Sequence, residues 1–182
     1  MAYDQIWLTG FMGTGKSRIA RPLAAALDWR PLDIDTLIEE DAGERISDIF
    51  AHGGESAFRV IESRVITRVS EMSQIVVATG GGSILAVSNR LLMKQRGYIV
   101  CLDAQPETIA MRLRDSGRHQ SERPLLGSDD SLARIVELKA ARQALYEEAD
   151  LVIGTDTLTP DQVTHAILTA FRERTAVPKS AP

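Results

Sequence analysis

The chain has 182 residues, of which 44% are hydrophobic and 25% are charged, and its formal net charge is −4 with a pI near 5.4. This length suits one domain with a substantial core, so we expect a single domain over residues 1–174, followed by a flexible tail at 175–182. The acidic balance disfavours nucleic-acid partners, because nonspecific binding to nucleic acid needs a basic face.

Membrane and secretory functions are also disfavoured. No apolar stretch approaches the roughly 20 residues that a membrane-spanning helix needs. The N-terminal "MAYDQIWLTG" carries an Asp and lacks the basic region and small-residue cleavage site of a signal peptide. Cys101 is the one cysteine, which excludes an intramolecular disulfide and a multi-cysteine zinc site. We therefore expect a cytoplasmic protein without membrane contact.

Short apolar runs alternate with helical patterns along the chain. The runs are "IWLTG", the weaker "RPLDID", "IVVATG", "YIVCLD" and "DLVIGT". Strands that alternate with amphipathic helices indicate βαβ units, and these build a mainly parallel sheet covered on both faces. We predict a three-layer α/β fold with a central five-stranded sheet.

A phosphate-binding loop follows the first strand. Residues 10–17, "GFMGTGKS", match GxxxxGK[ST] in full, between a predicted strand and a predicted helix. Gly10, Gly13 and Gly15 allow backbone turns that point several N–H groups at phosphate oxygens, and the start of the helix adds its positive dipole end. Lys16 is predicted to reach the β- and γ-phosphates, and the hydroxyl of Ser17 to bind Mg²⁺. An accidental glycine-rich turn is the alternative.

The second run ends in a pair of acids, Asp33 and Asp35, within "LDIDTLIEE". On an extended strand, side chains at i and i+2 point the same way, so both carboxylates are expected to face one site. One acid would hold Mg²⁺ and the other would orient or deprotonate an attacking hydroxyl. The alternative is that one of them only caps the helix that follows.

Two arginines have an ordinary interpretation when each is taken alone. Arg59 and Glu62 in "FRVIE" are three residues apart on a predicted helix, the spacing of a surface ion pair of little energetic weight. Arg142 in "ARQALYEEAD" resembles the many helical arginines that are solvated.

The stretch "IVVATGGGS" at 75–83 replaces an expected acid with glycines. A P-loop protein commonly carries a magnesium-binding aspartate at such a strand end, but no Asp or Glu lies between Met72 and Leu102. Asp33 is a candidate replacement. Gly80, Gly81 and Gly82 would then let a ring-sized substrate approach the backbone closely. A flexible turn is the alternative.

Residues 115–131, "DSGRHQSERPLLGSDDS", break the strand and helix pattern. The segment is longer than the usual connection inside a domain, which is typical of a mobile lid. Arg123 of "ERPLL" is held before a proline within this lid. We expect it to swing onto a transferring phosphoryl group when the lid closes.

Taken together, "GFMGTGKS", "LDIDTLIEE", "GGESAFRVIES", "ATGGGS", "ERPLL" and "RQALYEEAD" resemble the motifs of shikimate kinases, over about residues 5–172. The combination and order of six motifs are far more specific than any one of them. The resemblance implies a P-loop kinase fold and transfer of the γ-phosphoryl of ATP to the 3-hydroxyl of shikimate, giving shikimate 3-phosphate and ADP on the route to chorismate and the aromatic amino acids. It also implies a monomer with ATP, shikimate and Mg²⁺ as its partners.

The resemblance assigns roles to individual residues. Asp35 would contact the acceptor hydroxyl as candidate general base, and Asp33 would hold Mg²⁺ with Ser17. Arg59, oriented by Glu62, would bind the shikimate carboxylate with Arg142, while Gly81 presents its backbone to the substrate. Arg123 would reach the ATP phosphates, and Arg114 would pack on the adenine, with Arg112 and Arg118 as close alternatives. The predicted nucleotide contacts in the P-loop are Gly13, Thr14, Gly15, Lys16, Ser17 and Arg18; the predicted catalytic residues are Lys16, Asp35 and Arg123.

Two departures from the family pattern affect the nucleotide side. "SRIA" stands where the family often has "STIG", so Arg18 and Ala20 replace a Thr and a Gly. In addition, "GTDTLTPD" lacks the Arg that many members place by the adenine before the last helix.

Three rival functions stay open at this point: a gluconate kinase, a nucleoside monophosphate kinase, and a nucleotide-binding regulator without turnover. The regulator would have lost the lysine, the acid or the lid arginine, whereas Lys16, Asp35 and Arg123 are all present.

Overall fold

The computed structural model describes residues 3–115 and 132–176. Its strands are β1 (Gln5–Thr9), β2 (Arg30–Asp33), β3 (Ile75–Ala78), β4 (Tyr98–Asp103) and β5 (Leu151–Gly154). Its α-helices are α1 (Lys16–Leu27), α2 (Ile34–Ala42), α3 (Ile46–Val69), α4 (Val87–Arg96), α5 (Pro106–Asp115), α6 (Leu132–Ala140), α7 (Gln143–Tyr146) and α8 (Pro160–Ala176), with a 3₁₀ turn η1 (Ser83–Leu85).

The five strands form one sheet in the order β2-β3-β1-β4-β5, and every pairing between them is parallel. The three inner strands are apolar runs buried on both faces, as expected for a covered parallel sheet. The edge strand β2 is mostly exposed, which explains why its sequence run is the weakest. The predicted five-stranded α/β fold is confirmed.

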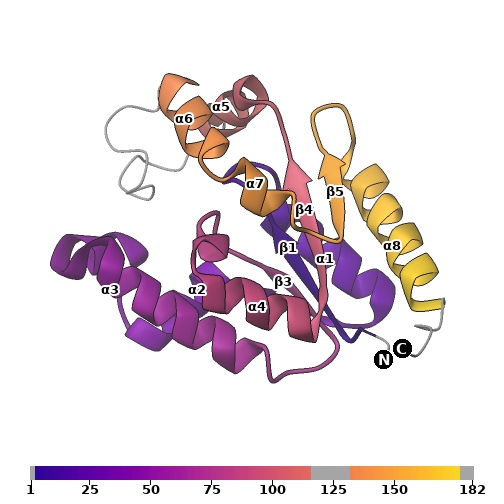
Figure 1. Ribbon diagram of the computed structural model, residues 1–182, viewed down its shortest axis with the longest axis horizontal. Helices are drawn as coiled ribbons and strands as arrows, with labels where there is room; N and C mark the ends of the chain where they lie inside the picture. Colours follow the sequence, from indigo (N-terminus) through magenta and orange to yellow (C-terminus); the bar gives the residue numbers. More distant parts are fainter. Residues whose placement is uncertain (1–2, 116–131, 177–182) are drawn as a thin grey trace.

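Two hydrophobic cores cover the two faces of the sheet. On one face, Leu8, Val76 and Val100 pack against α1 and α8; on the other, Trp7, Val77 and Ile99 pack against α2, α3 and α4. Figure 1 shows α8 alongside β5 and α1, and α2, α3 and α4 beyond the other face. Successive residues of each strand alternate between the cores, because neighbouring side chains on a strand point to opposite faces.

Helix α8 begins at a capping box. The backbone N–H of Thr159 donates to Gln162 Oε1 (2.8 Å), and the N–H of Gln162 donates to Thr159 Oγ1 (3.3 Å). The helix continues to Ala176, past the domain boundary expected at 174.

Helix α3 is bent at Gly54, whose backbone has φ 67 and ψ −172. A positive φ of this kind suits glycine, so the residue separates a first arm that begins at Ile46 from a second arm that carries Arg59 and Glu62.

Strands β1 and β3 are neighbours in the sheet, but the helices that follow them, α1 and α4, pack on opposite faces. Ligands of open α/β sheets bind at such a point, beyond the carboxyl ends of the strands. The loop from β1 to α1 therefore lies where a ligand site is expected. Among the described residues, no helix is long and apolar enough to span a membrane.

Candidate active site

The P-loop (residues 10–17) connects β1 to α1, as predicted. Gly10, Gly13 and Gly15 all have positive φ, at 125, 79 and 102. A Cβ on Gly10 would lie 2.1 Å from the carbonyl oxygen of Leu102, so a side chain there would collide with β4. The three glycines thus adopt the kind of backbone turn that their spacing predicts.

Lys16 lies beneath this loop. Its side chain is buried, and Nζ donates hydrogen bonds to the carbonyl oxygens of Gly10 and Phe11, both at 2.8 Å. An ammonium group has three N–H donors, so one remains for a phosphate oxygen. Burial lowers the pKa of the Lys16 ammonium to about 8, although Asp35 and Asp33 nearby oppose the shift.

Asp33 ends strand β2 and also caps helix α2. Its Oδ1 accepts a hydrogen bond from the backbone N–H of Asp35 (3.1 Å), and its Oδ2 accepts one from Ser17 Oγ (2.6 Å). The prediction that Asp33 and Asp35 both project from an extended strand is wrong, because the strand ends at Asp33 and Asp35 lies in the first turn of α2. Asp33 therefore caps α2 with one carboxylate oxygen and contacts Ser17 with the other.

The Ser17 and Asp33 oxygens fit a magnesium ion that is held mainly by phosphates and water. No group of three or more His, Cys, Asp or Glu side chains that could hold a metal occurs within residues 3–115 and 132–176. Mg²⁺ is usually bound by one or two carboxylates together with nucleotide phosphates, so a fuller protein cage is not required.

Arg59 and Glu62 form a pair that is buried on the glutamate side and half-buried on the arginine side, so the expectation of a weak surface pair is wrong. The Glu62 carboxylate is inaccessible to solvent (0%), and its Oε2 accepts a hydrogen bond from Arg59 Nη1 (2.6 Å). Burial by itself would lower the pKa of Arg59, but Glu62 and Glu55 outweigh it and hold the pKa above the usual guanidinium value. Arg59 and Glu62 are three residues apart on α3, as predicted. The Glu62 side chain is buried where α3 packs against η1.

Gly80, Gly81 and Gly82, here called the glycine loop, pack tightly against functional groups. A Cβ would lie 3.1 Å from Asp35 Oδ1 at Gly80, 3.1 Å from the backbone nitrogen of Met12 at Gly81, and 2.3 Å from Arg59 Nη2 at Gly82. All three glycines line the cleft described below. Because they have no side chains, the loop that follows β3 can pack against both the P-loop and the second arm of α3.

Arg142 is not solvated, in contrast to its interpretation as an ordinary helical arginine. It precedes α7, only 5% of its surface is exposed, and its guanidinium lies 5.6 Å from the centre of the Phe11 ring. Its Nη1 donates to the carbonyl oxygen of Gly81 (3.3 Å), which also accepts a hydrogen bond from the Tyr146 hydroxyl (2.6 Å). Burial raises the pKa of Tyr146 above its usual range.

Sequence reasoning missed Tyr146. The one available signal was its place four residues after Arg142, which puts both on the same side of one helical turn.

Arg112, an alternative adenine contact in the sequence analysis, is paired with Thr155, which the sequence did not reveal. Arg112 donates to Thr155 Oγ1 (2.9 Å) and to the carbonyl oxygen of Thr155 (2.6 Å). These contacts connect α5 with the loop between β5 and α8. Both residues line the cleft, whereas Arg114, the predicted adenine contact, donates back to the Ala110 carbonyl (3.2 Å) and is not among the lining residues.

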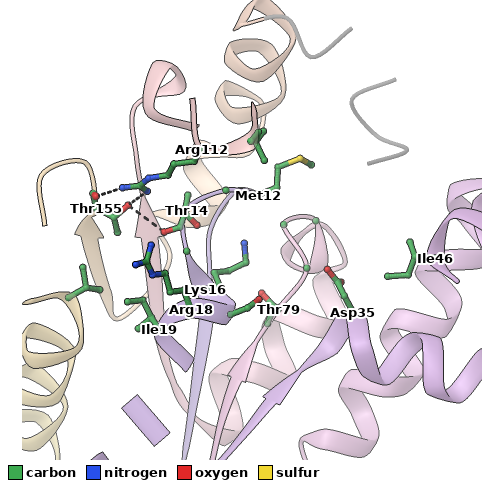
Figure 2. Close-up of a pocket in the computed structure, with 18 of the residues that line it drawn as sticks. Met12, Thr14, Lys16, Arg18, Ile19, Asp35, Ile46, Thr79, Arg112 and Thr155 are labelled. Carbon is green, nitrogen blue, oxygen red and sulfur yellow. Dashed lines mark hydrogen bonds between the residues drawn. The ribbon is translucent and has the colours of Figure 1, made fainter. Parts of the chain in front are cut away.

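One cleft of about 710 Å³ joins most of the predicted residues. Figure 2 shows Arg112 and Thr155 toward one end, Asp35 and Ile46 toward the other, and Lys16 between them. The P-loop half of the cleft is lined by Met12 to Ile19 with Arg112, Thr155, Leu158 and Pro160; the glycine-loop half is lined by Asp35, Ile46, Phe50, Phe58, Arg59, Glu62 and Gly80 to Gly82. Arg123, Arg118 and all of the expected lid except Asp115 lie outside the described residues.

Comparisons with known proteins agree with this arrangement. A family model described as shikimate kinase matches residues 12–172. The shikimate kinase of Symbiobacterium thermophilum is 41% identical over 170 residues, which cover 93% of this chain and 97% of the relative. That of Geobacter sulfurreducens is 42% identical over 166 residues, covering 91% and 90%.

Solved structures give the same result. A shikimate kinase from Acinetobacter baumannii in complex with shikimate superposes with a TM-score of 0.89 at 33% identity and 96% coverage of both chains. Shikimate kinase from Aquifex aeolicus gives a TM-score of 0.81 at 31% identity, covering 94% of this chain and 98% of the other. The chain therefore belongs to the shikimate kinase family, the ATP-dependent enzymes that phosphorylate the 3-hydroxyl of shikimate.

Proposed function

We propose that this chain performs the family reaction in the cleft between the P-loop and the glycine loop, with shikimate in the glycine-loop half. The observation that supports this most is that one cleft holds a phosphate-binding loop and, in its other half, the acid Asp35 and the arginine Arg59. The Acinetobacter baumannii relative, similar over nearly the whole chain, was solved with shikimate. Gluconate and nucleoside monophosphates are less suitable acceptors on this basis.

On the nucleotide side, the backbone of Gly13 to Ser17 would bind the phosphates at the N-terminus of α1, and Lys16 would neutralise charge on the β- and γ-phosphates. Arg18 lies in the cleft lining with its side chain exposed, so it would add positive charge near the nucleotide. Arg123 would act from the lid. Arg114 remains the proposed adenine contact, with Arg112 the alternative that lines the cleft.

Ser17 and Asp33 would hold Mg²⁺, because their oxygens already lie 2.6 Å apart beside the P-loop. When bound, Mg²⁺ neutralises charge on the β- and γ-phosphate oxygens. Asp33 would thus supply the acid that strand β3 lacks at its end.

On the acceptor side, Asp35 would orient the 3-hydroxyl and accept its proton. The new bond forms between the acceptor oxygen and the γ-phosphorus, the bond from that phosphorus to the β-γ bridging oxygen breaks, and ADP leaves. Arg59 and Arg142 would bind the shikimate carboxylate, a role that suits forked donors. The glycine loop would allow the ring to approach the backbone of Gly80, Gly81 and Gly82.

We also propose that the enzyme works as a monomer in the cytoplasm, where its ATP is available. Residues 1–174 would be one kinase domain, with residues 115–131 as its lid and 175–182 as a tail.

The acceptor is tested by measuring ADP release with shikimate, gluconate and AMP in parallel. Shikimate alone should support turnover. Turnover with gluconate or AMP and none with shikimate would refute the acceptor assignment, and binding of ATP without turnover on any of the three would favour a regulator.

The metal site is tested by titrating Mg²⁺ in the same assay. Asp33→Asn should raise the Mg²⁺ concentration needed for half-maximal rate, because one carboxylate ligand is lost. Asp28→Asn is the matched control, since Asp28 is an exposed residue at the opposite end of α1. An unchanged Mg²⁺ requirement in Asp33→Asn would remove Asp33 from the metal site.

A further inference from the structure

The Glu62 carboxylate has two partners on two different oxygens. Arg59 Nη1 donates to Oε2 at 2.6 Å, and Ser83 Oγ donates to Oε1 at 2.5 Å. Both Glu62 and Ser83 are fully buried, at 0% exposure. A buried carboxylate is costly unless it is paired and hydrogen-bonded, so each partner matters to where this group points.

Ser83 is itself held rigidly. It begins the 3₁₀ turn η1, directly after the glycine loop, and its backbone N–H donates to the Gly80 carbonyl (3.2 Å). Its own carbonyl accepts a hydrogen bond from the buried side chain of Asn89 on α4 (3.1 Å), and Arg90 donates to the next carbonyl, that of Ile84 (2.6 Å). Helix α4 therefore fixes the position of the Ser83 hydroxyl.

Gly80 leaves room for this contact. A Cβ at Gly80 would lie 3.0 Å from Glu62 Oε1 and 3.3 Å from Ser83 Oγ, so a larger residue would press on both ends of the hydrogen bond.

The arrangement determines which N–H groups of Arg59 can change their hydrogen-bond partner when a substrate carboxylate arrives. Its Nε and Nη2 contact Glu55 Oε1 at 3.2 and 2.9 Å, and the Glu55 side chain is 49% exposed. Its Nη1 contacts Glu62, whose side chain is 1% exposed. An incoming carboxylate can replace the exposed partner, whereas Glu62 stays and holds the guanidinium. Without Ser83, the Glu62 carboxylate would be free to turn both oxygens toward Arg59 and occupy further donors.

We propose that Ser83 is a positioning residue for shikimate binding: it fixes Glu62 through Oε1, and Glu62 in turn fixes the carboxylate-binding face of Arg59. This inference rests on the role proposed for Arg59 above. It connects α4 and η1, which do not themselves carry a predicted site residue, with recognition of the acceptor.

The first test is Ser83→Ala, with steady-state constants for both substrates. We expect the KM for shikimate to rise about tenfold, the scale for losing one hydrogen bond to a charged group, with kcat and the KM for ATP within about twofold of wild type. Ser70→Ala is the matched control: Ser70 is also buried (2%), but its hydroxyl donates to the Thr67 carbonyl at the end of α3. An unchanged shikimate KM, or an equal rise in both KM values, would overturn the proposal.

Ser83→Cys serves if the alanine variant does not fold, since a thiol has similar size and is a weaker donor. Its shikimate KM should rise by about threefold to tenfold; a wild-type value would contradict the proposal.

Two further variants separate this inference from the proposed function. If Arg59→Lys leaves the shikimate KM unchanged, the role of Arg59 itself fails; if Arg59→Lys raises it and Ser83→Ala does not, only the role of Ser83 fails. In a Glu62→Ala background, which removes both carboxylate oxygens, adding Ser83→Ala should raise the shikimate KM less than about twofold, because the two act through one contact. A full additional tenfold rise would show that Ser83 does not act through Glu62.

Discussion

The P-loop half and the glycine-loop half of the cleft hold their charged groups in different ways. In the P-loop half, consecutive residues are shaped by three glycines of positive φ, and the lysine is bonded to the carbonyls of the loop itself. In the glycine-loop half, side chains from α3, η1, α7 and the residue before α7 are hydrogen-bonded to one another or to the backbone of the glycine loop. The first half is a local structure and the second is a network, so substitutions should affect them differently.

Asp35→Asn should have the largest effect, because it removes the proposed proton acceptor and leaves both binding halves in place. We expect kcat to fall at least about a hundredfold, the low end for loss of a general base. ADP binding measured by calorimetry should stay within about twofold of wild type. A turnover near that of wild type would exclude Asp35 from the chemistry.

The pH dependence of binding should separate the two halves next. Lys16 has its pKa lowered by burial to about 8, so it loses its proton as the pH rises through that value, whereas a phosphate ligand favours the protonated ammonium. ADP affinity should therefore fall up to about tenfold per pH unit above about pH 8. Calorimetry in two buffers of different ionisation enthalpy should detect proton uptake on binding near pH 8.5.

Shikimate affinity is the internal control for this measurement. Its proposed ligands are guanidinium groups, which stay protonated throughout, and the pKa of Arg59 is raised further. The affinity for shikimate should stay level between about pH 7 and 9.5. A parallel fall for both ligands would mean that the two halves are not electrostatically separate.

Alanine substitutions in the glycine loop should act on one half or on both, depending on position. At Gly82 the new Cβ would displace the Arg59 guanidinium, 2.3 Å away, so the shikimate KM alone should rise about tenfold. At Gly81 the Cβ would press on the Met12 backbone of the P-loop, 3.1 Å away, so the KM values for both substrates should rise. Equal effects of the two variants on ATP would contradict this division.

Tyr146→Phe should have the smallest effect. It removes one neutral hydrogen bond to the Gly81 carbonyl, and Arg142 remains as a second donor to the same oxygen. The shikimate KM should rise about threefold and the Tm should fall by about 2–4 °C. Tyr98→Phe is the control, since Tyr98 lies in the core formed with α1 and α8; equal changes in both variants would refute a specific role for Tyr146.

The position and backbone shape of the P-loop were predictable because their determinants are contiguous in sequence. The strand order of the sheet was not predicted, although the five runs and their parallel pairing were. On the acceptor side, Asp35 was proposed from the spacing of the acid pair, and Arg59 and Arg142 were proposed through the family resemblance, but the contacts of these arginines were not predicted. Ser83 lies 21 residues from Glu62, and Tyr146 lies 65 residues from Gly81, distances at which no local pattern indicates contact.

The acid pair shows a second limit. The rule that side chains alternate along a strand does not reach Asp35, because the strand ends at Asp33. The Asp33 carboxylate accepts the Asp35 N–H and caps helix α2, which begins there. From sequence alone, an aspartate at the end of an apolar run fits both the end of a strand and the cap of a helix, and only the partner of its side chain distinguishes the two.

Helix α3 lines the cleft with residues from both sides of its bend at Gly54. Ile46 and Phe50 from the first arm and Phe58, Arg59 and Glu62 from the second all line it, while Gly54 itself does not. A Cβ at Gly54 would meet nothing within 4 Å, so a larger residue is resisted there only by the positive φ. The bend at Gly54 therefore sets how the two arms of α3 are placed around the cleft, and it does so from a residue that is not part of the cleft lining.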